Sequence, residues 1–307
     1  MTTVRIINYM KWRHVATAIV VALVLGSLGS LAVKGMVFGL DFTGGTQVEV
    51  GFEPAVDPSV VRSQLAEAGI DNPVVVQFGS ERDLLIKFQA EPDKDTEQRI
   101  VTALSTEGVS VDFRRMEFVG PQVGQELRDD GVLAIIVAFG LIMLYVAVRF
   151  QYKFAIGAVL GQVVDMIVVL GFFSFFELEF DLTVLAALLA VIGYSLNDTI
   201  IVYDRVRENF RLVRDAKPID VINESLTQVL LRTIYTSLST LLVLLALFYF
   251  GGELIHNFAL MLIIGVIWGT VSSIYVAVSA LLWFRVSRED LMQKTTEPGM
   301  DEFDGLP

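Results

Sequence analysis

The chain has 307 residues, of which 54% are hydrophobic, and it has a formal net charge of −12. The apolar residues come in long blocks that one ordinary soluble core could not bury, so the composition indicates a membrane protein. The acidic balance gives no support for nucleic-acid binding, and the absence of cysteine excludes disulfides and thiolate metal sites.

Six long apolar blocks predict six transmembrane helices. Each block is close to the roughly 20 residues that a helix needs to cross the hydrocarbon core, where only internal hydrogen bonds can satisfy the backbone. The blocks are residues 15–33, 132–148, 154–176, 182–203, 233–250 and 258–284. Lys11 and Arg13 precede the first block in the manner of a signal peptide. That block is longer than a usual signal core and has no small-x-small cleavage site after it, so we expect an uncleaved span.

The placement of Lys and Arg predicts the orientation. Basic residues gather before span one, after span six and in the loops after spans two and four, whereas the loops at 177–181 and 251–257 have none. By the positive-inside rule, both termini are cytoplasmic. We therefore divide the chain into residues 1–33 (cytoplasmic N-terminus and span one), 34–130 (an extracytoplasmic domain), 131–285 (spans two to six) and 286–307 (a cytoplasmic acidic tail).

Residues 34–130 predict a ferredoxin-like α+β domain. Their patterns follow the order strand, helix, strand, strand, helix, strand, which is the split βαβ arrangement. The predicted strands are residues 46–52, 74–78, 84–88 and 109–118, and the predicted helices are residues 57–69 and 95–107. Neither His14 nor His256 falls in this domain, and its carboxylates are scattered. This pattern favours a binding or mechanical module over an enzyme.

Two glycine-rich strings flank the domain. Residues 38–46 read FGLDFTGGT and residues 118–124 read FVGPQVG. The first is no phosphate loop, because its glycines precede a strand and no Lys-Ser/Thr follows. We expect Gly44, Gly45, Gly120 and Pro121 to form a hinge where the domain joins the membrane.

Asp198 in span four is the leading candidate for a functional residue. A charge in hydrocarbon costs roughly 2.5 to 3.5 kcal/mol on insertion scales, so it requires a reason. Tyr194 can share a helix face with Asn197 and Asp198, which lie three and four residues after it, among further polar neighbours. The carboxylate could exchange a proton on a hydrated path, or it could be satisfied by neighbouring helices as a purely structural group.

Three further polar residues lie within or at the ends of spans. Asp165, in span three, is either a second member of a proton relay or interhelical glue. Arg232, at the inner end of span five, either snorkels to the interface or pairs with Asp198, with support from Gln228 one turn earlier. An Asp–Arg pair that breaks on protonation would form a switch.

Two other patterns concern packing. The segment 204–217 mixes charges with Val206 and Phe210, as an interfacial amphipathic helix would. Gly265, Gly269 and Ser273 repeat every four residues in span six, which predicts a close helix contact.

Several of these strings resemble the SecF family, the smaller partner in the SecD–SecF complex of bacterial protein translocation. The resemblance is carried by FGLDFTGGT, FVGPQVG, LTVLAALLAVIGYSLNDTIIVYDRVREN, SLTQVLLRTIYTS, the FGG at 250–252 and IGVIWGTVSSIYVA. It covers nearly the whole chain except the acidic tail. The layout is also similar to one half of a resistance-nodulation-division transporter.

The resemblance implies an auxiliary subunit of the Sec translocase that couples proton motive force to late stages of protein export across the bacterial cytoplasmic membrane. It implies SecD, the SecYEG channel, YajC or YidC, translocating preproteins and the lipid bilayer as partners. The family's intramembrane acid falls on Asp198, its arginine on Arg232 and a further common carboxylate on Asp165. Residues 162–165 read QVVD, where many relatives have His immediately before the Asp. This departure argues against a His-assisted role for Asp165.

Two alternatives stay open. The chain could be half of a transporter that exports a small molecule or lipid, although the outer segment is small for a substrate-binding domain. It could also be a structural subunit whose Asp198 and Arg232 only hold helices together. No constellation of residues indicates a hydrolase, a transferase, a cofactor or a metal site.

Overall fold

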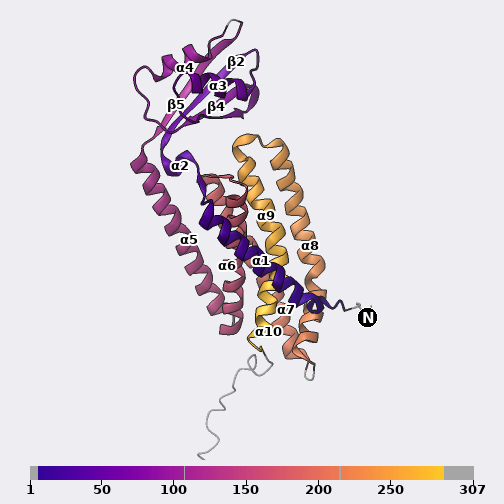
Figure 1. The fold of residues 1–307 in the computed structure, drawn as a ribbon. Helices are drawn as coiled ribbons and strands as arrows, with labels where there is room; N and C mark the ends of the chain where they lie inside the picture. The colour runs from indigo at the N-terminus through magenta and orange to yellow at the C-terminus, as the bar shows by residue number, and fades with distance from the viewer. Residues whose placement is uncertain (1–5, 107, 214–215, 287–307) are drawn as a thin grey trace, which may run out of the picture.

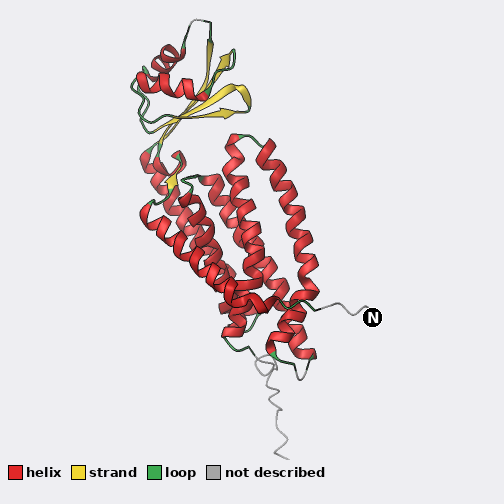
Figure 2. Cartoon of the chain, turned by 45° about the vertical axis from the view of Figure 1, so that its right-hand side comes forward, coloured by secondary structure: helices red, strands yellow, loops and turns green. Residues whose placement is uncertain are grey.

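The computed structural model describes residues 6–106, 108–213 and 216–286. It has two parts, a bundle of long helices and an α+β domain that stands at one end of the bundle (Figures 1 and 2). Six helical segments in the described ranges are long and apolar enough to cross a membrane. The prediction of a six-span membrane protein is therefore confirmed.

The spans are built from long, nearly continuous helices. Their elements are η1 (Tyr9–Trp12) with α1 (Arg13–Val33), α5 (Pro121–Arg149), α6 (Tyr152–Phe175), α7 (Leu182–Leu212), α8 (Pro218–Phe250), and finally η2 (Glu253–Ile255), α9 (His256–Ser272), η3 (Ser273–Ala277) and α10 (Val278–Trp283). The element η3 is a π-helical turn within span six. Pro121 and Pro218 each open a helix, a position where a missing backbone N–H costs nothing.

The prediction of an interfacial amphipathic helix at residues 204–217 is wrong. Helix α7 continues without a break to Leu212, and Val206 and Phe210 are buried in the core of the bundle. Their four-residue spacing extends the inward face of α7, so they pack against protein and not against lipid. Residues 214 and 215 of that predicted segment lie outside the described ranges.

Four strands and two helices form the α+β domain in its described residues. They follow the chain order β2 (Gly45–Glu53), α3 (Pro58–Glu67), β3 (Val74–Phe78), β4 (Ser80–Phe88), α4 (Thr96–Leu104) and β5 (Ser110–Val119). The sheet order is β3-β4-β2-β5 with antiparallel pairing throughout, which is the topology of the split βαβ fold. Alternate residues of β2, such as Val48 and Val50, are fully buried under α3 and α4. The domain therefore has its own core.

A small junction connects the domain to the bundle. The two-residue strand β1 (Val37–Phe38) pairs in parallel with β6 (Glu179–Phe180), which lies just before α7. The four-residue helix α2 (Leu40–Thr43) then leads directly into β2. On the other side, α5 runs unbroken from Pro121 through the division that we drew between residues 130 and 131.

Helix α7 lies inside the bundle and packs on α6, α8 and α9. The closest approach is to α9, where a Cβ on Gly265 would lie 2.2 Å from Val191 Cγ2 and one on Gly269 would lie 2.9 Å from Ser195 Cβ. No larger residue fits at either position without a shift of the helices. The predicted close contact of the small residues in span six is confirmed for these two glycines.

Candidate intramembrane proton site

Asp198 lies near the middle of α7 and is completely buried. Neither of its carboxylate oxygens has a hydrogen-bond partner among the described residues. Thr270 of α9 is its polar neighbour, but the Thr270 hydroxyl donates to the carbonyl of Val266 at 2.8 Å. A buried carboxylate without partners is unusual, because buried polar groups are nearly always hydrogen-bonded.

Hydroxyl groups from three helices extend the site beside Asp198. Ser237 Oγ of α8 lies 2.8 Å from Thr270 Oγ1, and Tyr194 Oη of α7 donates to Ser237 Oγ at 3.3 Å. Tyr194 thus reaches Thr270 through Ser237, and its supporting role at Asp198 stays a prediction. Thr270 and Ser237 were missed in the sequence, although hydroxyl groups in otherwise apolar spans are the pattern that would have found them.

Asp165 forms a second polar cluster between α6, α7 and α9. Ser195 Oγ donates a hydrogen bond to Asp165 Oδ2, while Asp165 Oδ1 has no partner among the described residues. Trp268 and Ser272 of α9 are its other polar neighbours. No described hydrogen bond joins Asp165 to Asp198, so the two acids occupy separate clusters that share α7.

Gln162 of α6 is linked to the Asp165 cluster through Ser195. With its amide oriented so that both atoms are satisfied, Gln162 Nε2 donates to the carbonyl of Ile192 at 3.1 Å, and Gln162 Oε1 accepts from Leu196 N at 3.0 Å. The same oxygen lies 3.2 Å from Ser195 Oγ. Gln162 therefore connects α6 to α7.

The expected pair between Asp198 and Arg232 is not formed. Arg232 is exposed on α8, and its side chain forms no ion pair or hydrogen bond with a described residue. The reason is geometric: successive residues on a helix are about 100° apart, and it is the next residue, Thr233, that is buried against the bundle. Arg232 therefore lies on the outward face of α8.

Gln228 and Asn197 also lie away from Asp198. Gln228 Oε1 accepts from Arg205 Nε at 2.5 Å and from Asn209 Nδ2 at 2.8 Å, so it supports Arg205 and not Arg232. Asn197 is exposed, although it directly precedes Asp198. Within the described residues, neither Gln228 nor Asn197 supports an Asp198–Arg232 pair.

Gly44 and Gly45 of the expected hinge are closely packed. Gly44 has φ +74°, and a Cβ there would lie 2.9 Å from Pro121 N and Cα. A Cβ on Gly45, where φ is +143°, would lie 2.6 Å from the carbonyl oxygen of Phe88. Gly120 is different, since its nearest neighbour would be a Phe118 carbon at 3.8 Å. The two connections thus lie against each other, and bending at this point stays a prediction.

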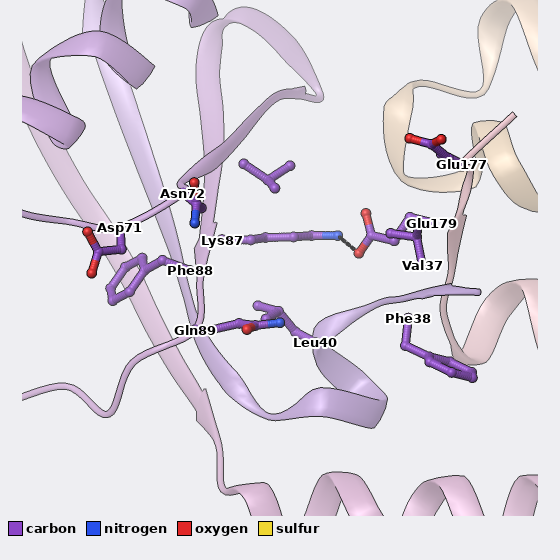
Figure 3. Close-up of a pocket in the computed structure, with 11 residues that line it drawn as sticks. Val37, Phe38, Leu40, Asp71, Asn72, Lys87, Phe88, Gln89, Glu177 and Glu179 are labelled. Atoms are coloured by element: carbon purple, nitrogen blue, oxygen red, sulfur yellow. Dashed lines mark hydrogen bonds and ion pairs between the residues drawn. The ribbon is translucent and has the colours of Figure 1, made fainter. Parts of the chain in front are cut away.

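A cavity of about 510 Å³ lies between the sheet and the bundle (Figure 3). Its apolar wall includes Val37, Leu40 and Phe88. Across it, Lys87 Nζ of β4 lies 3.0 Å from Glu179 Oε1 of β6, as the dashed line in Figure 3 shows. This ion pair connects the α+β domain to the start of α7. In the described ranges no three His, Cys, Asp or Glu residues are grouped closely enough to hold a metal ion.

Two family models match the chain. The model described as "Protein export membrane protein SecD/SecF, C-terminal" matches residues 100–287, and the "SecD/SecF GG Motif" matches residues 29–56. The chain belongs to the SecD/SecF family. The resemblance seen in the sequence is confirmed, and the second match includes the packed glycines at 44 and 45.

Individual members of the SecD/SecF family agree over almost the full length. The protein translocase subunit SecF of Pseudomonas aeruginosa is 49% identical over 298 residues, covering 96% of this chain and 97% of that protein. The same subunit of Escherichia coli O157:H7 is 39% identical over 311 residues, covering 99% and 96%. The solved structure of SecDF, a translocon-associated membrane protein from Thermus thermophilus, is 36% identical with a TM-score of 0.82. That match covers 93% of this chain but only 40% of the SecDF chain.

Proposed function

We propose that this chain is an auxiliary subunit of the Sec protein translocase, which acts with SecD and couples proton motive force to late stages of protein export. The observation that carries the proposal is Asp198, a carboxylate buried within a span with both oxygens unpartnered by the described residues. The names of the curated relatives support the translocase context. A carboxylate without other partners can bind a proton, which neutralises its charge.

The orientation follows from charge. Basic residues gather at the C-terminal ends of α5 and α7, for example Arg149, Arg205 and Arg207. These helix ends lie at the end of the bundle opposite the α+β domain (Figure 1). By the positive-inside rule we place that end and both termini in the cytoplasm, with the α+β domain on the outer side of the bacterial cytoplasmic membrane. There the domain could meet preproteins that emerge from SecYEG, and YajC or YidC are further candidate partners.

Two exposed polar residues support a partner within the membrane. Arg232 and Asn197 are exposed at the level of the spans, where charged and amide groups are costly unless another protein covers them. SecD is the partner we propose for this surface. The SecDF chain from Thermus thermophilus extends well beyond the part that matches this fold, which supports such an arrangement.

The proposed mechanism is a cycle of protonation. An ionised Asp198 in the present packing has no described partner, and such a charge costs roughly 2.5 to 3.5 kcal/mol in hydrocarbon. A proton from the outer side removes this cost, whereas a cationic group of the partner would stabilise the ionised form in a second packing. Free energies of this size are sufficient to shift a two-state equilibrium by about a hundredfold.

The test is Asp198→Asn in the assembled complex with SecD. We expect the proton-motive-force-stimulated part of preprotein translocation into inverted membrane vesicles to be lost, because Asn cannot exchange a proton. Asp71→Asn, a matched change at an exposed residue of the α+β domain, should retain it. Undiminished stimulation with Asp198→Asn in a correctly assembled complex would refute the proposal.

The same vesicles separate the alternative functions. Proton flux that requires a translocating preprotein supports the proposal. Flux without any preprotein would favour a small-molecule or lipid exporter, and no flux at all would favour a purely structural subunit.

A further inference from the structure

Asp41, in the short helix α2, contacts the first residue of the helix that carries Asp198. Asp41 Oδ2 accepts a hydrogen bond from Leu182 N at 3.1 Å, between residues 141 positions apart in the chain. Leu182 opens α7, and the first N–H groups of a helix have no partner within the helix. Asp41 is the acceptor that the fold supplies for this N–H.

Ordinary capping of α7 is already provided by Asp181. Asp181 Oδ1 accepts from Val184 N at 2.8 Å and from Thr183 Oγ1 at 2.7 Å, as an N-cap residue does. The contribution of Asp41 differs because it comes from another element. It connects α7 to α2 in addition to stabilising the helix end.

The position of α2 gives this connection its significance. Helix α2 leads directly into β2, the central strand that pairs with both β4 and β5. Its Phe42 ring stacks on Phe180 with centroids 6.1 Å apart, and Gly39 N donates to the carbonyl of Phe180 at 2.9 Å. Helix α2 is thus held between the sheet of the α+β domain and the start of α7.

Helix α7 can transmit a displacement over its length. It is continuous from Leu182 to Leu212, so Asp198 lies 16 residues, or roughly 24 Å, from the Asp41 contact on one rigid element. We infer that Asp41 is a positioning residue that fixes the start of α7 to the connector of the α+β domain, so that a displacement of the domain moves the helix bearing Asp198, and the reverse. This inference rests on the proposed proton-coupled function.

The experiment compares Asp41→Ala, Asp41→Asn and Asp181→Ala in the complex with SecD in lipid vesicles. Hydrogen-exchange mass spectrometry with fragmentation measures the Leu182 amide, whose protection depends on Asp41 and not on an intrahelical bond. We expect at least tenfold faster exchange of Leu182 with Asp41→Ala and near wild-type exchange with Asp41→Asn, because the asparagine retains an acceptor oxygen.

Translocation with and without proton motive force is the second readout. With Asp41→Ala, the translocation that depends on proton motive force should fall at least fivefold, while translocation without proton motive force stays unchanged. With Asp41→Asn, the dependent part should stay within twofold of the wild type. Asp181→Ala removes the local cap but leaves the connection to α2 in place, so it should retain the stimulated part.

Three results would overturn the inference. They are wild-type exchange of Leu182 in Asp41→Ala, full stimulation in Asp41→Ala, and an equal loss of stimulation in Asp41→Ala and Asp181→Ala, which would reduce Asp41 to a helix stabiliser. A different result would refute the proposed function. Asp198→Asn would then retain full stimulation, while the exchange of the Leu182 amide in the Asp41 variants would still follow the pattern expected above.

Discussion

Replacement of Gly44 by alanine tests whether the junction is a flexible hinge or a packed joint. Gly44 has φ +74° and ψ 163°, a region that is essentially restricted to glycine and costs other residues about 1–3 kcal/mol. The new Cβ would also lie 2.9 Å from Pro121 N and Cα and 3.0 Å from the carbonyl oxygen of Val119. These are backbone atoms that cannot rotate away, so overpacking adds about 1–3 kcal/mol.

The two terms together predict a loss of about 2–6 kcal/mol in local stability. Because Gly45 pairs with Val119 next to the clash, the loss should be largest at the shared end of β2 and β5. Amide hydrogen exchange of these two strands in the membrane-embedded protein is the measurement. A loss of 2 kcal/mol would accelerate exchange by about thirtyfold.

Two other glycines separate the contributions. Gly79→Ala keeps the backbone cost, since φ is +78°, but nothing lies within 4 Å of the added Cβ. Gly120→Ala has neither the backbone cost nor the steric clash, because φ is −64° and the nearest atom to the added Cβ lies at 3.8 Å. It should change stability by less than about 0.5 kcal/mol. If Gly44→Ala exchanged like Gly120→Ala, the packed joint would be refuted and a flexible hinge favoured.

Two further predictions concern hydrogen bonds of α7 and the ion pair between the α+β domain and the bundle. Tyr203→Phe removes the buried hydrogen bond from Tyr203 Oη to the carbonyl of Ala277 at 2.7 Å, and leaving that carbonyl unsatisfied should cost about 1–3 kcal/mol in unfolding titrations. Tyr194→Phe removes a longer, partly buried bond and should cost less; equal losses would contradict this ranking. Lys87→Glu should weaken attachment of the domain to the bundle, and adding Glu179→Lys should restore it with a coupling energy of about 0.5–1 kcal/mol in a double-mutant cycle on thermal stability. A coupling energy of zero would show that the ion pair contributes nothing.

The sequence predicted the elements better than their contacts. Long apolar blocks identified all six spans, and the strand at Val74–Phe78 has the predicted bounds. Hydrophobic blocks reveal a helix because lipid requires twenty apolar residues in succession, whatever surrounds them. The β-rich runs were equally clear because alternate burial imposes a period of two.

The candidate site could be predicted only in part. The burial of Asp198 and Asp165 followed from their positions in apolar blocks. The partner assigned to Asp198 was wrong because spacing along one helix does not say which face meets which neighbour. Arg232 and Thr233 are adjacent in sequence, yet only Thr233 faces the bundle. Helix packing decides between them, and it depends on close contacts such as those of the α9 glycines with α7.

The π-helical turn at Ser273–Ala277 determines which residues of span six face each neighbouring helix. Before this turn the small residues of the span face α7, whereas Ala277, the last residue of the turn, and Ala280 after it face Gly161 and Gly157 of α6. A π-turn contains one residue more than an α-turn, so deleting a single residue there would leave a regular α-turn with the flanking residues close to their present faces. Deleting a residue earlier in the span, where the helix is α-helical, would instead rotate everything that follows by about 100°. The span would still cross the membrane, but its last third would present the wrong face to α6. Insertions and deletions in this family should therefore avoid the α-helical parts of span six even where the hydrophobicity of the chain would tolerate them, and the π-helical turn is the place where a single-residue deletion can be absorbed.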